Sequence, residues 1–489
     1  MFTLFLIMKR TFVVNLFLLV FLNLLVKPFW IFGIDRVVQI EVSEETYGMY
    51  YALINFSFLF NIVLDAGITN FNNKNVAQHK QMLQKHFSWM FSTKLILGAA
   101  YAIVTMSAAI MLGYSSMVLP MLGWLILNQF LASFILYLRS NISGLLLFKQ
   151  DSLLSILDRV IMILLVGYLL YVRVSDQPFD IMWFVYAQTI AYALTSVIGF
   201  LVVKGHVKVI KLSWKPVVSI AVLKQSLPFA MLILLMTLYN RTDAIMLERL
   251  HPDGAFQTGV YAKGYRLLDA LNNIAYLFAA LLLPIFSRLA IEKKSVNEVV
   301  KSAQNLLLPA SVFIAFFCWQ FQVEITQMLY PNTTELNYAV FSWLMIGFVA
   351  VSFNYIHGTL LTANNYLKAL NIMAICALLL NVVLNFTFIP SHGALGAAIA
   401  TIVTQFFTVI IQGYLVHKKG MYQFKWKFFA KTGAFLVSLV IIHHVVKQME
   451  WTLIQQMVCI GFAGILLAWV FKFVQIRQVK NLIRQKDAD

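Results

Sequence analysis

Two stretches of the chain share one order of residues: FGIDRVVQIEVSEETYGMYYA at residues 32–52 and NRTDAIMLERLHPDGAFQTGVYAKG at residues 240–264. In each stretch an Asp near the end of an apolar run is followed by an aliphatic segment and an acidic polar loop. A Gly-x-Tyr motif then opens the next apolar run. The second copy is longer by a short insertion that fits in the loop. The pattern predicts two related parts, each built on the same helix–loop–helix element.

Composition indicates a membrane protein. Hydrophobic residues make up 61% of the 489 positions and charged residues only 12%, whereas soluble domains carry about 25% charged residues. Apolar runs of about 20 residues, long enough to cross a hydrocarbon core of about 30 Å as helices, recur along the chain. We predict an all-α polytopic membrane protein with about 14 transmembrane helices, near residues 12–34, 47–69, 91–112, 117–138, 154–172, 182–203, 226–247, 259–286, 304–328, 338–360, 370–389, 394–416, 430–446 and 452–471.

The spacing of the two copies predicts the domain organisation. An even number of expected helices separates them, so both copies cross the membrane in the same direction. Parallel repeats of this kind build two lobes around a central site in transporters. We predict an N-terminal lobe at residues 1–215, a C-terminal lobe at 216–420, and two further helices with a basic cytoplasmic tail at 421–489.

The distribution of positive charge predicts the orientation, because cytoplasmic connections are enriched in Lys and Arg. With the N-terminus inside, most of the 37 Lys and Arg residues fall on the cytoplasmic side. The net charge of +17 is then explained by positive residues that face anionic lipid, and it does not indicate a nucleic-acid-binding site. The first apolar run lacks a small-residue cleavage site and is expected to remain as a helix, with both termini cytoplasmic. The outer connections hold only Arg36, Arg173, Arg249 and Lys447.

The connections and the reactive side chains argue against an enzyme. All loops are short, and none has the Gly-rich phosphate cradle of a nucleotide-driven protein. His443 and His444 have no partner at metal-ligand spacing, so no metal site or cofactor is expected. The cysteines stand singly in apolar runs and are interpreted as small hydrophobic residues: Cys318, Cys376 and Cys459.

The ordered motifs resemble a known superfamily. They are LLVKPFWIFGIDR with YGMYYALINFSFLFNIVLDAGITNFNNKNVAQ, then DAIMLERL with TGVYAKGYRLLDA, and GALGAAIATIVTQ. Each motif alone has low specificity, but the order and spacing of the motifs over the whole chain are specific. The chain resembles the multidrug/oligosaccharidyl-lipid/polysaccharide exporter superfamily, and within it the polysaccharide repeat-unit flippases of bacterial inner membranes, of the O-antigen and capsule type.

The resemblance implies a function. A lumen between two lobes would open to either side in turn, and the cargo would be an undecaprenyl-pyrophosphate-linked glycan whose tail stays in lipid. Relatives in the superfamily are coupled to an ion, so H+ or Na+ is the expected coupling ion. Membrane lipids and the polysaccharide polymerase machinery, which serves lipopolysaccharide synthesis, are the other expected partners.

Cations inside the apolar runs are the candidate substrate site. Lys263, Arg266, Asp269 and Asn273 follow one another at spacings of three and four, which places them on one stripe of a helix. A charge facing lipid near the membrane centre would cost at least about 2.5–3.5 kcal/mol, so the stripe must face protein or water. Arg forks suit pyrophosphate oxygens. The predicted substrate-binding residues are therefore Lys27, Arg241, Lys263, Arg266 and Asn273.

The same side chains have a second interpretation. The cations lie in the outer thirds of their helices, where they can reach the interface, and Arg241 can pair with an acid. Asp35, Asp243 and Asp269 are candidate proton or sodium sites, because poor hydration raises the pKa of an acid; each is equally a candidate counter-charge. Two further residues are expected to be structural, Arg159 as an ion pair with Asp158, and Asp65.

Three other functions are consistent with parts of the sequence. A lipid II flippase, which handles a peptidoglycan precursor, would share the cationic cavity. An ion-coupled multidrug exporter of the same fold would prefer an acidic and aromatic lining for cationic drugs, which the excess of cations disfavours. A membrane glycosyltransferase would need a sizeable outer loop with paired acids, for which Glu44 and Glu45 are the candidates.

Overall fold

The computed structural model describes most of the chain. All regular secondary structure in this part is helical, and ten of its helices are long and apolar enough to cross a membrane. The predicted class, an all-α polytopic membrane protein, is confirmed. The described residues are 22–23, 25–65, 68–69, 72, 76, 81–145, 147–172, 178–207 and 216–473, without the side chains of residues 81, 82, 85, 86, 216–230, 233, 280 and 284.

Some sequence predictions lie outside the described residues. They are the first part of the helix expected at 12–34 and the positive charges expected in cytoplasmic connections and in the tail, at residues 9–10, 74–80, 208–215 and 474–489.

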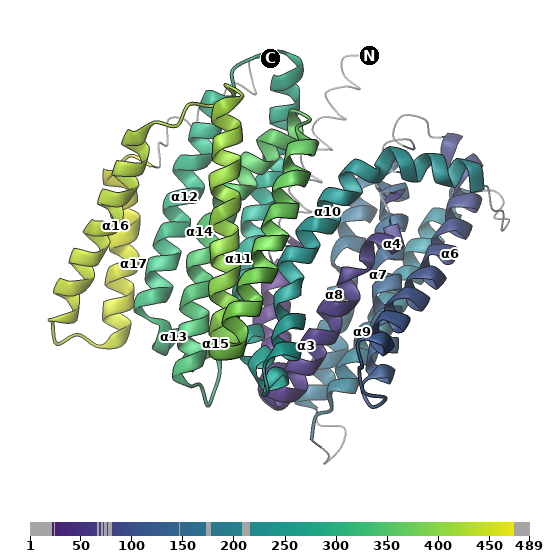
Figure 1. The fold of residues 1–489 in the computed structure, drawn as a ribbon, viewed down its shortest axis with the longest axis horizontal. Helices are drawn as coiled ribbons and strands as arrows, with labels where there is room; N and C mark the ends of the chain where they lie inside the picture. The colour runs from purple at the N-terminus through teal and green to yellow at the C-terminus, as the bar shows by residue number, and fades with distance from the viewer. Residues whose placement is uncertain are drawn as a thin grey trace. The chain divides into compact units, whose positions relative to one another are not determined.

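Two compact units divide the chain, and the first runs to Arg266 and also takes in Ala374–Ala397. Within it α7 packs against α6 and α9, α8 packs against α9, and α3 packs against α10 (Figure 1). Ser43 caps α3 by accepting a hydrogen bond from the Thr46 amide, 3.1 Å away. The helices that begin and end in this unit are η1 (Trp30–Asp35), α2 (Arg36–Glu41), α3 (Glu44–Leu59), α4 (Asn61–Asp65), α6 (Gln81–Met111), α7 (Leu119–Gly144), α8 (Phe148–Tyr171), α9 (Ile181–Lys204) and α10 (Pro216–Leu250).

The second unit holds Leu267–Met373 and the residues from Ala398 onward. In it α12 packs against α14, and α16 and α17 pack against each other and against α12, around a core that includes Phe316, Phe435 and Ile460. The helices that begin and end in this unit are α12 (Asn297–Gln320), α13 (Gln322–Leu329), α14 (Glu335–Ala363), α16 (Trp426–Lys447) and α17 (Leu453–Val470).

Two long helices belong partly to each unit: α11 (Gly254–Ile291) and α15 (Leu367–Lys418). The units are defined by packing, whereas the predicted lobes are defined by the repeated sequence pattern. The division at 1–215, 216–420 and 421–489 therefore stays a prediction.

Four predicted helices differ in their continuity. The run at 47–69 is interrupted at Phe60, between α3 and α4, and the run at 304–328 is interrupted at Phe321, between α12 and α13. The runs at 370–389 and 394–416 join into α15, with a kink at Gly393, where φ is 51°. Pro390 removes a backbone donor just before the kink, and glycine accepts the positive φ. Apolar composition alone carries no signal for such breaks.

A buried ion pair corrects the expected start of one helix. The sequence pattern places Lys94 in the connection before the helix at 91–112, but α6 begins at Gln81 and buries Lys94 to 2% exposure. The Lys94 ammonium pairs with Asp65 and donates to the Leu64 carbonyl, 3.0 Å away. Because the partner neutralises the charge, the helix can extend past it. The expected structural role of Asp65 is consistent with this pair.

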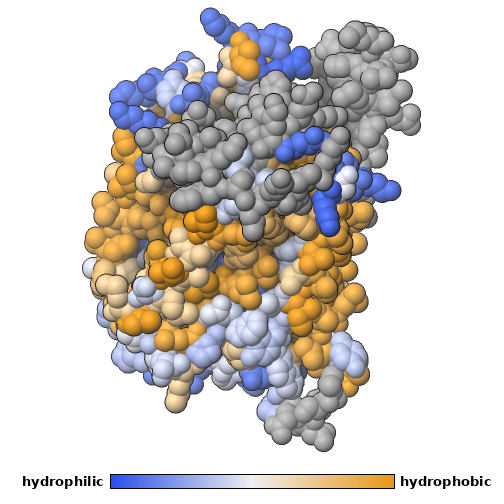
Figure 2. Space-filling view, turned by 90° about the vertical axis from the view of Figure 1, so that its right-hand side faces the viewer, coloured by the Kyte–Doolittle hydropathy of each residue, from blue (hydrophilic) through white to orange (hydrophobic). Residues whose placement is uncertain are grey.

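Hydrophobic side chains gather on the lateral surface. On the face in Figure 2, orange residues occupy the middle of the visible surface and blue residues lie toward its upper and lower ends. Exposed apolar side chains such as Leu164, Ile410 and Phe462, each about two-thirds exposed, belong to helices that can cross a membrane. The protein is therefore a multi-pass membrane protein, whose exposed apolar surface the lipid covers.

Candidate functional site

Asp35 is the centre of a buried polar cluster in the first unit. It ends the π-helical segment η1, in which the backbone N–H of Arg36 bonds to the Ile31 carbonyl, and such wide turns are frequent at functional sites. The carboxylate is 1% exposed. Tyr47 donates its hydroxyl to both carboxylate oxygens at 3.0 and 3.1 Å, and Gln39 donates at 3.0 Å.

Arg266, on α11, completes this cluster. Its Nε lies 3.2 Å from the Asp35 carboxylate and 3.2 Å from the Tyr47 hydroxyl. Its guanidinium carbon lies 5.2 Å from the centre of the Tyr51 ring, which is a cation–π contact. Two predicted site residues, one assigned to ion coupling and one to substrate, are thus direct partners. The cluster joins α11 to η1 and α3.

Lys263 forms a second ion pair one helical turn earlier on α11. Its ammonium contacts the carboxylate of Glu44, in the first turn of α3, and the two side chains are 9% and 19% exposed. Glu44 was expected only as a candidate catalytic acid. Its observed contact is that of a counter-charge. The stripe on α11 therefore faces protein in this structure, as the cost of exposing charge to lipid requires.

The two Gly-x-Tyr motifs meet at a close crossing of α3 and α11. A Cβ atom on Gly48 would lie 1.8 Å from the Ala255 carbonyl oxygen, and one on Gly259 would lie 2.1 Å from the Glu44 carbonyl oxygen. Both positions therefore require glycine, because any side chain would overlap the other backbone. The two copies of the repeated pattern therefore pack directly against each other.

Arg241 and Asp243, the unexpected charges of the second copy, have different surroundings. Two residues apart on α10, they point about 200° apart around the helix. Arg241 donates to Asn55 on α3 at 3.1 Å and lies 5.0 Å from the centre of the Phe58 ring. Asp243 is 1% exposed. Arg241 thus contacts α3, whereas Asp243 is enclosed in the helix packing.

Asp243 lies among buried polar side chains. It accepts hydrogen bonds from Asn381 at 2.8 Å, from Asn385 at 2.6 Å and from the Tyr261 hydroxyl at 3.3 Å. Both amides belong to the part of α15 that packs in the first unit and are fully buried. In the described chain the Asn385 Oδ1 atom is buried without a hydrogen-bond partner. Both amides direct N–H groups at the carboxylate in this structure, and after a half-turn their oxygens would suit a small hard cation.

The remaining predicted residues are not brought to these clusters. Lys27 is half-buried in the first unit, near the charges of Arg159, Arg139 and Asp158. In the second unit, the Asn273 amide donates to the backbone carbonyl of Asp269 at 2.8 Å, so this hydrogen bond lies within its own helix. The expected pair of Arg159 and Asp158 is confirmed at 3.8 Å.

Several cluster members were not singled out from the sequence as site residues: Gln39, Tyr47, Asn55 and Tyr261. Tyr261 belongs to the repeated Gly-x-Tyr motif, which could have identified it. Asn55 belongs to a weak polar stripe of the helix expected at 47–69, which could have identified it. Nothing in the sequence marks Gln39 or Tyr47, because their roles depend on which helix packs opposite them.

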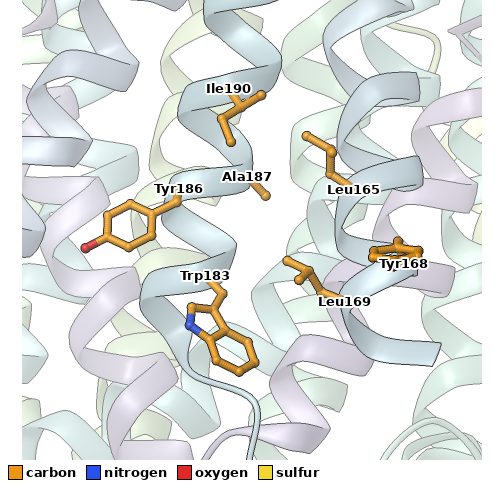
Figure 3. Close-up of a pocket in the computed structure, with 7 residues that line it drawn as sticks. All are labelled: Leu165, Tyr168, Leu169, Trp183, Tyr186, Ala187 and Ile190. Carbon is orange, nitrogen blue, oxygen red and sulfur yellow. The ribbon is translucent and has the colours of Figure 1, made fainter. Parts of the chain in front are cut away.

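A pocket between α8 and α9 is separate from the charged clusters. Figure 3 shows Leu165, Tyr168 and Leu169 on one helix opposite Trp183 and Ile190 on the other. Its lining of apolar and aromatic side chains carries no charge. It is therefore unsuited to a phosphate head group.

The fold and the charged clusters define a polytopic α-helical membrane protein that holds cations and acids inside its helix packing. The family described as polysaccharide biosynthesis protein matches residues 12–290. The chain belongs to this family.

Individual relatives cover parts of the chain. A lipid III flippase of Escherichia coli is 31% identical over 149 residues, which is 30% of this chain and 36% of the relative. The chain thus spans only about a third of the length of that relative. An uncharacterised membrane protein of Methanocaldococcus jannaschii is 26% identical over 232 residues, 44% of each chain.

Solved structures confirm the fold over nearly the whole length. A lipid II flippase, MurJ, in an inward closed conformation has a TM-score of 0.68 at 16% identity, covering 97% of this chain and 99% of that one. A multidrug resistance MATE family transporter of the MOP superfamily in an outward-facing conformation has a TM-score of 0.57 at 16% identity, covering 83% and 94%. The multidrug/oligosaccharidyl-lipid/polysaccharide exporter fold is thus confirmed.

The glycine crossing makes a testable prediction. Gly48→Ala should lower the free energy of unfolding by about 1–3 kcal/mol or more, because the added methyl overlaps the Ala255 backbone. Gly433→Ala on α16, where a Cβ meets no atom within 4 Å, is the matched control and should leave stability equal or slightly higher. Thermal unfolding of purified protein in detergent measures both. Equal melting temperatures for Gly48→Ala and Gly433→Ala would contradict the crossing.

Proposed function

We propose that this protein is a flippase that moves undecaprenyl-pyrophosphate-linked oligosaccharide repeat units across the bacterial inner membrane by alternating access. Both termini are cytoplasmic in this proposal, and the polymerase of the same polysaccharide is the expected partner. The family description and the name of the Escherichia coli relative support a lipid-linked cargo. The observation that carries the proposal is the pairing of membrane-embedded cations with carboxylates at Arg266 and Lys263.

The carboxylates of Asp35 and Glu44 make the contacts that phosphate oxygens would make. Arg266 and Lys263 each direct a charged N–H group at an anionic oxygen, and a pyrophosphate offers several such oxygens at once. Lys263 and Arg266 are about 4.5 Å apart along the helix axis, close enough to bind one pyrophosphate. The cargo would replace the two acids rather than enter an empty cationic site.

This exchange supplies a reason for conformational change. With both acids in place, α11 is held against η1 and α3, and the Gly48–Gly259 crossing is closed. A pyrophosphate that takes the cations releases both pairs and favours the state in which the crossing opens. A ligand shifts such an equilibrium only through its different affinity for the two states.

Asp243 is the proposed coupling residue among the three candidate acids. Asp35 has Arg266 as its counter-charge, whereas Asp243 accepts hydrogen bonds from two buried amides and a tyrosine hydroxyl. A half-turn of the Asn381 and Asn385 amides would direct oxygens instead of N–H groups at the same point. In this proposal Na+ or H+ binds there and its gradient drives transport.

The sign of the substrate's charge tests the proposed function. Purified protein should bind a polyprenyl-pyrophosphate glycan and bind an organic cation such as tetraphenylphosphonium weakly, because the embedded cations attract anions. Equilibrium binding to the protein in nanodiscs measures both ligands under one condition. Tight binding of the organic cation with no binding of the pyrophosphate lipid would contradict the proposal and favour a multidrug exporter.

Substitution of Arg266 separates a substrate role from a structural one. Arg266→Ala should lower glycan export by roughly 10- to 100-fold, since hydrogen bonds to charged groups contribute about 1.5–3 kcal/mol. Arg266→Lys should restore part of it, because the guanidinium fork is lost, and Lys263→Arg should be tolerated better than Lys263→Ala. Export is measured per membrane-inserted molecule.

A matched double variant controls for the loss of the ion pair. Asp35→Asn with Arg266→Gln leaves no unpaired charge, so it should insert normally but still fail to export. Arg36→Ala, at a position that the sequence places in an outer connection, should have a small effect. Normal export by the double variant would show that Arg266 serves only to neutralise Asp35.

Asp243→Asn tests the coupling site. The variant should fold, because an amide can keep several of the hydrogen bonds, but its transport in proteoliposomes should no longer respond to an imposed Na+ or H+ gradient. Asp253→Asn, at an exposed loop position, is the control and should keep the response. A full gradient response in Asp243→Asn would exclude this acid as the coupling residue.

A further inference from the structure

Three lysines from three different elements converge at one end of the second unit. Lys301 lies in the second turn of α12, Lys431 in the second turn of α16, and Lys472 immediately follows α17. These helices pack against one another, and Lys301 and Lys472 are the two like charges that act on Lys431. Among the described residues none of the three forms an ion pair. Like charges gathered without an acid repel one another, so the fold maintains an unfavourable arrangement.

The backbone of Lys472 adds an independent sign of constraint. It closes the C-terminus of α17 with a positive φ of 53°, through bonds from Lys472 N to the Trp469 carbonyl and from Phe473 N to the Ala468 carbonyl. Glycine or asparagine usually occupies this position of the cap, because other side chains are strained there. Lys472 therefore occupies a cap position at which glycine would be less strained.

The same turn holds the neighbouring lysine in place. The Lys431 ammonium lies 4.0 Å from the centre of the Phe473 ring, and Phe473 is 4% exposed within the core of the unit. The charge of Lys431 is thus fixed on an aromatic face beside Lys472, whereas an ordinary surface lysine is free to extend into water.

The depth of the cluster matches a membrane–water boundary. Trp426 begins α16 and is 73% exposed, and Trp469 lies in the last turn of α17 and is 66% exposed. Tryptophan is enriched at this level of the bilayer. Directly along the same helices, Val437 and Ile465 are 58% and 72% exposed, so apolar surface that suits acyl chains continues from the charged end.

We propose that Lys301, Lys431 and Lys472 bind the phosphate head group of an anionic phospholipid whose acyl chains lie along α16 and α17. The head group relieves the repulsion of the three ammonium groups, and the apolar helix faces supply the second contact. Charge complementarity and the position at the boundary select a bilayer lipid over a soluble anion. The site is separate from the proposed substrate site and does not depend on it.

The experiment uses the full chain in neutral detergent with short-chain lipids of matched tails. Dioctanoyl phosphatidylglycerol should bind and raise the melting temperature, whereas dioctanoyl phosphatidylcholine should do neither. Lys431→Gln with Lys472→Gln should weaken binding of phosphatidylglycerol by about 30-fold, since each lysine near anionic lipid contributes roughly fivefold. Lys425→Gln with Lys427→Gln removes the same charge from exposed positions at the same end and should keep near-normal affinity.

Two further variants distinguish a loss of lipid binding from a loss of folding. Lys472→Gly suits the positive φ, so it should be at least as stable as the parent in phosphatidylcholine while losing most of the response to phosphatidylglycerol. Lys431→Arg should retain the response. Equal weakening by the two double variants, or equal binding of the two lipids, would overturn the proposal. Binding of glycerol phosphate as tight as that of phosphatidylglycerol would also overturn it, because the acyl contact would then be absent.

Discussion

The ion pair between Arg266 and Asp35, 3.2 Å apart, connects the two copies of the repeated sequence pattern. Desolvation makes either charge unfavourable alone within a membrane helix, so the two residues must be near each other and well hydrogen-bonded. Tyr47 and Gln39 donate further hydrogen bonds to the carboxylate oxygens. This requirement brings α11 against α3, and only glycine at residues 48 and 259 permits the approach.

The cost of burying a charge is offset in other ways elsewhere in the first unit. Lys94 and Asp65 neutralise each other beside a backbone carbonyl, whereas Arg241 and Asp243 hydrogen-bond to neutral amides. The first solution gives a fixed structural contact. The second surrounds each side chain with amides, whose oxygens would face a cation at Asp243 once the amides turn, as proposed above. This difference is the physical basis for assigning Asp65 to structure and Asp243 to coupling.

The sequence predicted the fold class because long apolar runs have few alternatives to helices in lipid. It also identified Arg266, Lys263 and Asp35, since a charge in such a run is conspicuous. It did not predict that Arg266 and Asp35 are partners, because they are far apart in the chain and only tertiary packing joins them. The breaks at Phe60 and Phe321 and the extension of α6 past Lys94 were missed for the same reason: each depends on neighbouring helices.

The repeat has an asymmetry that gives its two copies distinct roles. Asn55 follows Gly48 at the spacing at which Arg266 follows Gly259, so the two residues occupy equivalent positions. Asn55 accepts a bond from Arg241 on the helix before the second loop, and Arg266 pairs with Asp35 before the first loop. Each copy thus bonds across to the other in addition to its internal bonds from Tyr47 to Asp35 and from Tyr261 to Asp243. The two contacts lie on different helix pairs, since Arg241 joins α10 to α3 and Arg266 joins α11 to η1. Because α3 also crosses α11 at the two glycines, a motion of α3 changes the surroundings of both polar sites.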